Sequence, residues 1–275
     1  MFEDREAGRA GSLVQERVPE RTLAVEIFHQ LNDTEQKARC SLKLQKTLQL
    51  DGSPVAVAIV AEPPEGLKSL RRKLIACMMI QAARRGIDFY SSGESILCGA
   101  RAHLGIGESP IRNLDDFLVR REKLFGSKEA AGKFIESALK RAPEKGKYLA
   151  FSPLERACFV PDLVLFVGTP LQISRLIFLN AFKTGEVDLV HGEPLCSGAI
   201  ALPVTTGKIG ISFMDMACRQ FGKFMPEEMV IGVPYAKILR IIESIDQSVA
   251  GTARPDIILR LAGIMLRKSV PDRSG

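Results

Sequence analysis

Residues 54–63 read Pro-Val-Ala-Val-Ala-Ile-Val-Ala-Glu-Pro, and the class of the fold follows from this stretch. Its apolar run does not alternate with polar residues, which is typical of a strand that is covered on both faces. A helix is predicted to follow over 67–84, and the spacing of its apolar residues places Leu74 and Cys77 on the inner face. A buried strand followed by an amphipathic helix predicts an α/β or α+β protein.

Residues 161–170 read Pro-Asp-Leu-Val-Leu-Phe-Val-Gly-Thr-Pro and match the first stretch with both prolines in register. A helix is again predicted to follow. Each unit then reaches a Gly-Glu pair and a Leu-Cys pair, which contains Cys98 in the first unit and Cys196 in the second. We therefore expect two pseudo-repeated strand–helix–turn lobes, 54–105 and 161–213, that share one core and bring these two cysteines near each other. The alternative is that two generic strand–helix units align by chance.

The rest of the chain is expected to surround this core. Residues 1–20 are polar without periodicity and predict a flexible tail. Residues 21–53 predict a helical segment in which Asp33 caps the second helix. A single globular domain is expected over 54–275, with a charged helical insert at 110–142.

Two apolar stripes near the C-terminus predict extra helices, one after Pro234 and one after Pro255. The first stripe consists of Ile238, Ile241, Ile242, Ile245 and Val249, and the second of Ile257, Ile258, Leu261, Ile264 and Met265.

Composition excludes several classes of protein. The chain has 275 residues, 46% of them apolar, but no apolar run approaches the roughly 18 residues that cross a bilayer. Glu3 and Asp4 near the start of the chain do not fit a secretory signal, so we expect a cytoplasmic protein without a membrane partner. Six cysteines are too few for a disulfide scaffold, which favours free, buried or metal-bound thiols. The net charge of +6 is mild and Trp is absent, which makes nucleic acid an improbable partner.

The chain also resembles a known family, in motifs spread from about Pro54 to Ile242. These motifs are Ala76-Cys77, Phe89-Tyr90, Cys98-Gly99-Ala100, Leu104-Gly105, Cys196 and the stretch Ser212–Arg219. In these residues the chain is similar to the uncharacterised ArCR family, domain of unknown function 169. The resemblance implies a helix cysteine, a second cysteine in a Gly-rich turn, a third in the later half, and a Gly-Ser-Arg motif from which Ala217 and Cys218 depart. It implies no established activity.

Three cysteines carry the main functional hypothesis. Cys77, Cys98 and Cys196 come from different segments and could hold an iron–sulfur cluster or zinc, since thiolates bind both. A fourth ligand would come from Cys218 or from a carboxylate: Glu94, Glu193 or Asp215. No CxxC pair is present, however, and free cysteines are often plain core residues. His103 and His191 lie close in sequence to the turn cysteines and are candidate ligands or bases.

Two other functions remain open. A metal-free module could bind a small anionic ligand with Arg101 and Arg219, because the guanidinium fork suits carboxylate and phosphate; Asp215, Glu94 and Glu193 belong to the same candidate ligand-binding set. Alternatively, the C-terminal apolar stripe could dock on a protein partner or on a second copy of the chain. The sequence names no substrate or reaction.

Overall fold

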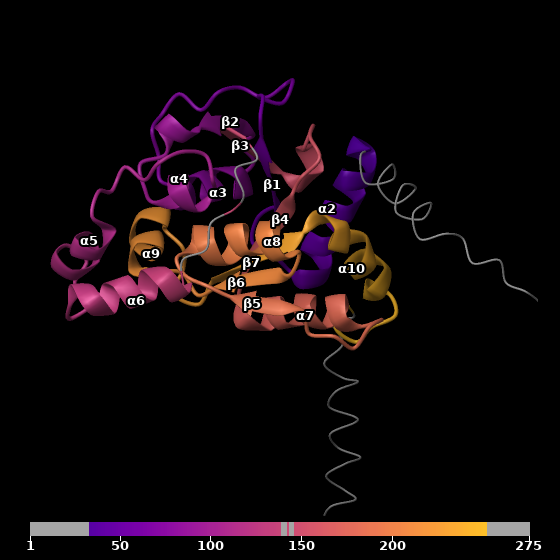
Figure 1. The fold of residues 1–275 in the computed structure, drawn as a ribbon. Coiled ribbons are helices and arrows are strands. Elements are labelled where there is room, and N and C mark those ends of the chain that lie inside the picture. Colours follow the sequence, from indigo (N-terminus) through magenta and orange to yellow (C-terminus); the bar gives the residue numbers. More distant parts are fainter. Residues whose placement is uncertain (1–32, 139–141, 143–145, 252–275) are drawn as a thin grey trace, which may run out of the picture.

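The computed structural model describes residues 33–138, 142 and 146–251. Its centre is a seven-stranded sheet with the strand order β2-β3-β1-β4-β7-β6-β5 (Figure 1). All neighbouring strands are antiparallel except β5 and β6, which are parallel. The mixed α/β fold predicted from the sequence is therefore confirmed. The strands are β1 (Val55–Val60), β2 (Phe89–Ser92), β3 (Tyr148–Pro153), β4 (Leu163–Gly168), β5 (Leu189–His191), β6 (Ile209–Ser212) and β7 (Met229–Pro234).

The position of β1 between two cores explains why its apolar residues do not alternate with polar ones. Val55, Val57 and Ile59 pack into the core on one face of the sheet, while Ala56 and Ala58 pack into a second core on the other face. Successive side chains of a strand point to opposite faces, so a strand with a core on each side needs apolar residues throughout. We call the face of Val57 the cysteine face and the face of Ala58 the α7 face.

Each face is covered by its own helices. The cysteine face is covered by α3 (Ala76–Arg84), α4 (Ala100–His103), the π-helical segment η3 (Cys196–Ala201) and α9 (Met216–Gly222). The α7 face is covered by α2 (Thr34–Leu48), α7 (Pro170–Ala181) and α10 (Ile238–Ile245). α5 (Leu114–Arg120) and α6 (Lys128–Ala138) lie together at one end of the molecule, beside α9 (Figure 1). α8 (Leu202–Thr206) continues η3, and short turns form η1 (Gly93–Ser95), η2 (Leu154–Arg156) and η4 (Tyr235–Lys237).

Two predicted helices begin at clear local signals. Asp33 caps α2, because its carboxylate accepts a hydrogen bond from the N–H of Glu35. Thr169 and Gln172 form a capping box at the start of α7, which satisfies backbone donors that would otherwise lack a partner.

The helix predicted over 67–84 is wrong in its first half, because α3 begins only at Ala76. The backbone N–H of Leu70 donates to the carbonyl of Tyr90 at 2.8 Å, and that of Leu74 also bonds outside its own segment. The chain before α3 therefore lies extended alongside β2 and cannot form helical hydrogen bonds. These tertiary hydrogen bonds outweigh the weak preference of single residues for a helix.

The pseudo-repeat is not confirmed. β1 and β4 are antiparallel neighbours, but α3 and α7, which follow them, cover opposite faces of the sheet. A two-fold axis that exchanges two antiparallel strands would place both helices on the same face. The segments α4 and η3, which follow the two Leu-Cys pairs, do lie in contact on the cysteine face.

Other expectations have mixed outcomes. Pro234 ends β7 and is the N-cap of the short 3-10 helix η4, after which α10 begins. The first C-terminal stripe forms α10 only as far as Ile245, because Val249 lies beyond the helix and is 55% exposed. The tail at 1–20, the first predicted helix and the helix after Pro255 fall outside the described residues. The domain boundaries stay predictions. Among the helices within 33–138 and 146–251, none has both the length and the apolar character needed to span a bilayer.

Candidate functional site

Four cysteines line one cavity on the cysteine face. Its volume is about 280 Å³, and the four come from α3, the loop before α4, η3 and α9. They are Cys77, Cys98, Cys196 and Cys218. Most of the other lining is apolar, so the cavity is a largely hydrophobic pocket with sulfur on several sides.

Cys77 and Cys218 form the closest pair, with 2.6 Å between their sulfur atoms. α9 places Cys218 there because Asp215 caps this helix: one carboxylate oxygen accepts from the N–H of Cys218 at 2.8 Å. The other oxygen lies 3.4 Å from the Cys218 sulfur. The same carboxylate thus sets the start of the helix and contacts the thiol.

Cys196 is positioned by an unusually close approach between η3 and the sheet. A Cβ atom on Gly232 of β7 would overlap the carbonyl oxygen of Ala199, and one on Gly198 would overlap that of Gly192. Glycine is therefore required at both positions, since only it lets these backbones meet. η3, which carries Cys196, therefore packs closely against β5, β6 and β7 and also contacts α4.

The cavity favours neutral thiols. Burial raises the pKa of Cys196 well above its ordinary value and also raises that of Cys98. The pKa of Cys218 is raised by its hydrogen bond with Cys77, by burial and by Asp215. For Cys77 the hydrogen bond with Cys218 lowers the pKa, but burial and the neighbouring Cys196 together leave it raised. At all four thiols, burial and neighbouring acidic groups make a further negative charge costly.

Three carboxylate side chains also line the cavity. Asp215, Glu193 and Glu122 line the cavity, and no lysine or arginine is among its lining residues. Burial raises the pKa of Glu193, although the hydroxyl of Ser212 and the N–H of Phe213 both donate to its carboxylate and oppose the rise. Burial, with Asp215 nearby, also raises the pKa of Glu122. A cation would lower the energy of all these groups together.

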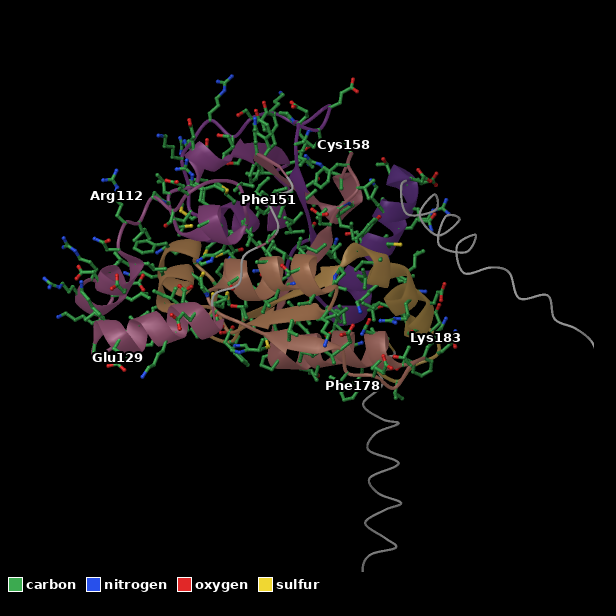
Figure 2. All side chains as sticks on the ribbon, viewed as in Figure 1. Arg112, Glu129, Phe151, Cys158, Phe178 and Lys183 are labelled. Atoms are coloured by element: carbon green, nitrogen blue, oxygen red, sulfur yellow. The ribbon has the colours of Figure 1, made fainter. Side chains whose placement is uncertain are left out.

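The insert provides the outer wall of the cavity. Leu114, Phe117 and Leu118 of α5 line it together with Phe134 of α6. These helices carry charges on their other side, such as the ion pair between Glu129 and Lys133. Figure 2 shows Glu129 on the outer side of α6. The insert is thus an amphipathic cover with its apolar side toward the cysteines.

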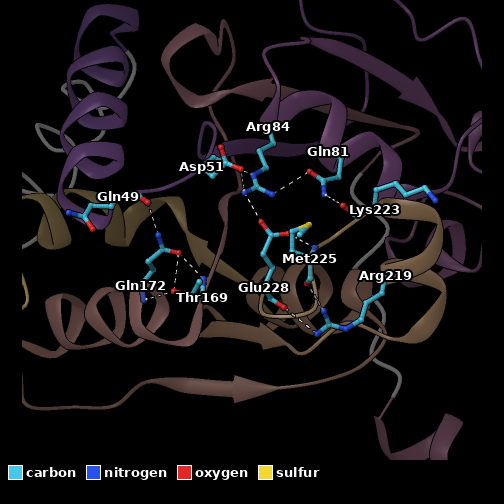
Figure 3. A network of polar contacts seen from close by, with 10 residues as sticks. All are labelled: Gln49, Asp51, Gln81, Arg84, Thr169, Gln172, Arg219, Lys223, Met225 and Glu228. Carbon is cyan, nitrogen blue, oxygen red and sulfur yellow. Dashed lines mark hydrogen bonds and ion pairs between the residues drawn. The ribbon is translucent and has the colours of Figure 1, made fainter.

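A polar network holds α9 against α3 (Figure 3). Arg84 of α3 and Glu228 form a buried ion pair at 2.7 Å, and Glu228 also accepts from the N–H of Met225 at 2.8 Å. Arg219 of α9 donates to four backbone carbonyls, those of Phe213, Met225, Pro226 and Glu228. Because α3 carries Cys77 and α9 carries Cys218, this network keeps the two sulfurs together.

The chain is similar to known proteins over most of its length. The model of a family described as uncharacterised ArCR, domain of unknown function 169, matches residues 43–244. The chain belongs to this family. It is also 29% identical to the uncharacterized protein MJ0308 of Methanocaldococcus jannaschii over 213 residues, which cover 74% of this chain and 91% of the relative. No solved structure matches it significantly.

This ArCR chain brings some predicted site residues together and separates others. Cys77, Cys98 and Cys196 share the cavity, and Cys218 joins them, as do Asp215 and Glu193. The remaining candidates, Glu94, Arg101 and Arg219, do not line it. Glu94 is exposed in η1, Arg101 is half-buried in α4 beside Gly107, and Arg219 belongs to the polar network. Whether any of them binds a ligand stays a prediction.

The histidines also differ from each other. His103 is buried and lines the cavity, whereas His191 is largely exposed and packs its ring against Phe213 at 5.2 Å. Sequence reasoning missed Glu122 and the covering role of the insert. The available signal was the apolar spacing of Leu114, Phe117 and Leu118 within an otherwise charged stretch.

The donor atoms of the described residues do not converge as ligands of one metal ion, although the sulfurs of Cys77 and Cys218 are only 2.6 Å apart. Within 33–138 and 146–251, no three His, Cys, Asp or Glu side chains are placed so that they could hold a single metal ion.

Proposed function

We propose that this ArCR protein binds an iron–sulfur cluster through Cys77, Cys98, Cys196 and Cys218. The observation that carries the proposal is that these four cysteines, from four separate segments, line one cavity of about 280 Å³. Four cysteine thiolates are the usual ligands of both [2Fe–2S] and [4Fe–4S] clusters.

The size of the cavity, about 280 Å³, favours a cluster over a single ion. Zinc needs four donors at about 2.0–2.3 Å from one centre, which requires a tight tetrahedral group. No such group is present among the described residues. A cluster spreads its iron atoms over several ångströms and so accepts ligands from the walls of a larger space.

The charge of the cavity favours a cationic metal centre over a small anionic ligand. Asp215, Glu193 and Glu122 add carboxylates, and no basic side chain lines the cavity, so a small anionic ligand would meet repulsion there. Cationic iron removes the cost of ionising buried thiols, because a coordinated thiol is deprotonated outright. The apolar wall of α5 and α6 would keep water from the cluster, and solvent exposure is one determinant of its reduction potential.

Anaerobic purification with measurement of iron, acid-labile sulfide and visible absorbance tests this function. The expected result is bound iron and sulfide with the charge-transfer absorbance of thiolate-bound iron. Four variants, Cys77→Ser, Cys98→Ser, Cys196→Ser and Cys218→Ser, should each lose most of the iron.

Two cysteines outside the cavity are matched controls. Cys40 is buried elsewhere and Cys158 is exposed, so Cys40→Ser and Cys158→Ser should retain the iron of the parent protein. A folded parent that remains free of iron after anaerobic reconstitution would contradict the proposal. Equal loss from the cavity variants and the controls would contradict the assignment of the ligands.

A further inference from the structure

α7 exposes an apolar stripe on its outer side, away from the cysteine cavity. Leu171 is 71% exposed, Phe178 62% and Phe182 44%. These positions fall on one side of the helix because they are spaced by seven and four residues. Figure 2 shows Phe178 at the outer edge of the molecule. We call Leu171, Phe178 and Phe182 the α7 stripe.

The last described residues of the chain are bound on this same side of α7. Arg175 lies between Leu171 and Phe178 along the stripe, four residues after one and three before the other. Its Nε donates to the carbonyl of Ala250 at 2.8 Å, and a terminal nitrogen lies 3.5 Å from the carbonyl oxygen of Gly251. Gly251, the last residue that the structure describes, therefore lies within reach of Arg175 on the side of the α7 stripe.

The sequence that follows has a matching pattern. Its apolar residues Ile257, Ile258, Leu261, Ile264 and Met265 recur at helical spacing. A helix over 257–265 would be about 12 Å long, and the α7 stripe from Leu171 to Phe182 extends over about 17 Å. The residues between Gly251 and Ile257 can reach any part of that stripe, since an extended chain spans about 3.3 Å per residue.

We infer that residues 252–275 dock in cis on the α7 stripe, with the Ile and Leu side chains of 257–265 packed against Leu171, Phe178 and Phe182. The N-terminal residues are a poorer occupant. They join the chain at Asp33, whereas it is the opposite end of α2, at Gln49, that contacts Gln172 in α7. This inference does not depend on the cluster.

The absence of tryptophan makes a clean test available. Phe178→Trp in the full chain introduces a single indole on the α7 stripe, and its emission maximum and acrylamide quenching report its exposure. We expect blue-shifted emission and weak quenching at low micromolar concentration. Adding Leu261→Asp and Ile264→Asp should shift the emission to the red and raise the quenching constant several-fold, because buried charge opposes docking.

Leu42→Trp is the matched control, since Leu42 on α2 is 53% exposed and outside the α7 stripe. Its indole should read as exposed with and without the two aspartates. Circular dichroism of each variant separates loss of docking from loss of folding. An exposed indole at position 178 in the full chain would overturn the inference. So would a blue shift that appears only as concentration rises, together with dimer in sedimentation, because that pattern identifies a second copy as the occupant.

Discussion

Arg84 and Glu228 are opposite charges buried together, at 2.7 Å and with both side chains below 10% exposure. A buried pair that loses one partner leaves a charge without adequate compensation, which costs about 3–5 kcal/mol. Without Glu228, Arg84 would keep only one charged partner among the described residues, the exposed carboxylate of Asp51 at 3.7 Å. We therefore predict that Glu228→Gln lowers the free energy of unfolding by about 3 kcal/mol, measured by urea denaturation. The exposed pair of Lys133 and Glu129 is the control, and Glu129→Gln should cost less than about 1 kcal/mol. Equal effects of the two changes would contradict the structural role of Glu228.

Lys37 gives a prediction for pH. Its ammonium is buried and donates to the carbonyls of Ala157 and Phe159, at 2.5 and 3.1 Å, and burial lowers its pKa. In the window between this lowered pKa and the ordinary value near 10.4, the unfolded chain binds more protons, so Lys37 makes stability rise with pH. Lys37→Met should remove this contribution. The difference in unfolding free energy between parent and variant, followed by urea denaturation from pH 8 to pH 10.5, should shift in favour of the parent as pH rises; a constant difference would contradict the prediction.

At the scale of elements, the contact between η3 and β7 sets the position of Cys196. Gly232→Ala places a methyl group against the carbonyl of Ala199, so η3 must move away from the sheet. Overpacking of this kind typically costs about 1–3 kcal/mol. We predict that loss of stability, measured by urea denaturation, together with a fall in the iron bound after anaerobic reconstitution.

Gly132→Ala provides the control for this glycine change. A Cβ atom there meets nothing within 4 Å, and the residue lies in α6, so the substitution should stabilise the protein by about 0.5–1 kcal/mol. Its iron content should stay that of the parent. A stable Gly232→Ala protein with unchanged iron would show that η3 tolerates displacement.

Elements with a purely local cause were predictable from the sequence. β1 and β4 carry continuous apolar runs, and α2 begins at a residue that caps its own helix. The helix predicted over 67–84 failed in its first half because Leu70 bonds to Tyr90, and such long-range pairing leaves no periodic trace in one sequence. The fold class was therefore accessible, but the boundaries set by tertiary hydrogen bonds were not.

The candidate site was accessible to a similar degree. Matching the two Leu-Cys pairs predicted that Cys98 and Cys196 would lie near each other, and the loop before α4 and η3 bring both to the same cavity. Cys218 was only one of several candidates for a fourth position, because its placement depends on the cap formed by Asp215. The cover formed by α5 and α6 was missed. The charged residues on their outer faces dominate the composition of this stretch. The spacing of apolar residues predicts an apolar helix face, but it does not predict which part of the protein that face will contact.

At the scale of the whole molecule, the cavity joins distant parts of the chain. Cys77 and Cys218 are separated by 141 positions, and the insert between α4 and β3 closes the space over them. The cavity walls are far apart in the sequence, so they come together only when the chain folds. A cluster bound by all four cysteines would therefore bind the folded state only, and its binding free energy would add to the free energy of folding.

This coupling predicts a single thermal unfolding transition whose midpoint rises when the cluster is bound. A ligand at 100 times its dissociation constant stabilises the native state by about 2.7 kcal/mol, which for a chain of this size shifts Tm by about 5–10 °C. Cluster-loaded protein should therefore unfold at least that much above cluster-free protein in differential scanning calorimetry under nitrogen. Cys158→Ser should show the same difference, because Cys158 lies outside the cavity, whereas Cys196→Ser, treated identically, should show none. Equal Tm values for loaded and cluster-free parent protein would mean that the iron binds outside the cavity. A centre that is bound to α3, η3 and α9 must be released before these elements can separate, so it has to raise Tm.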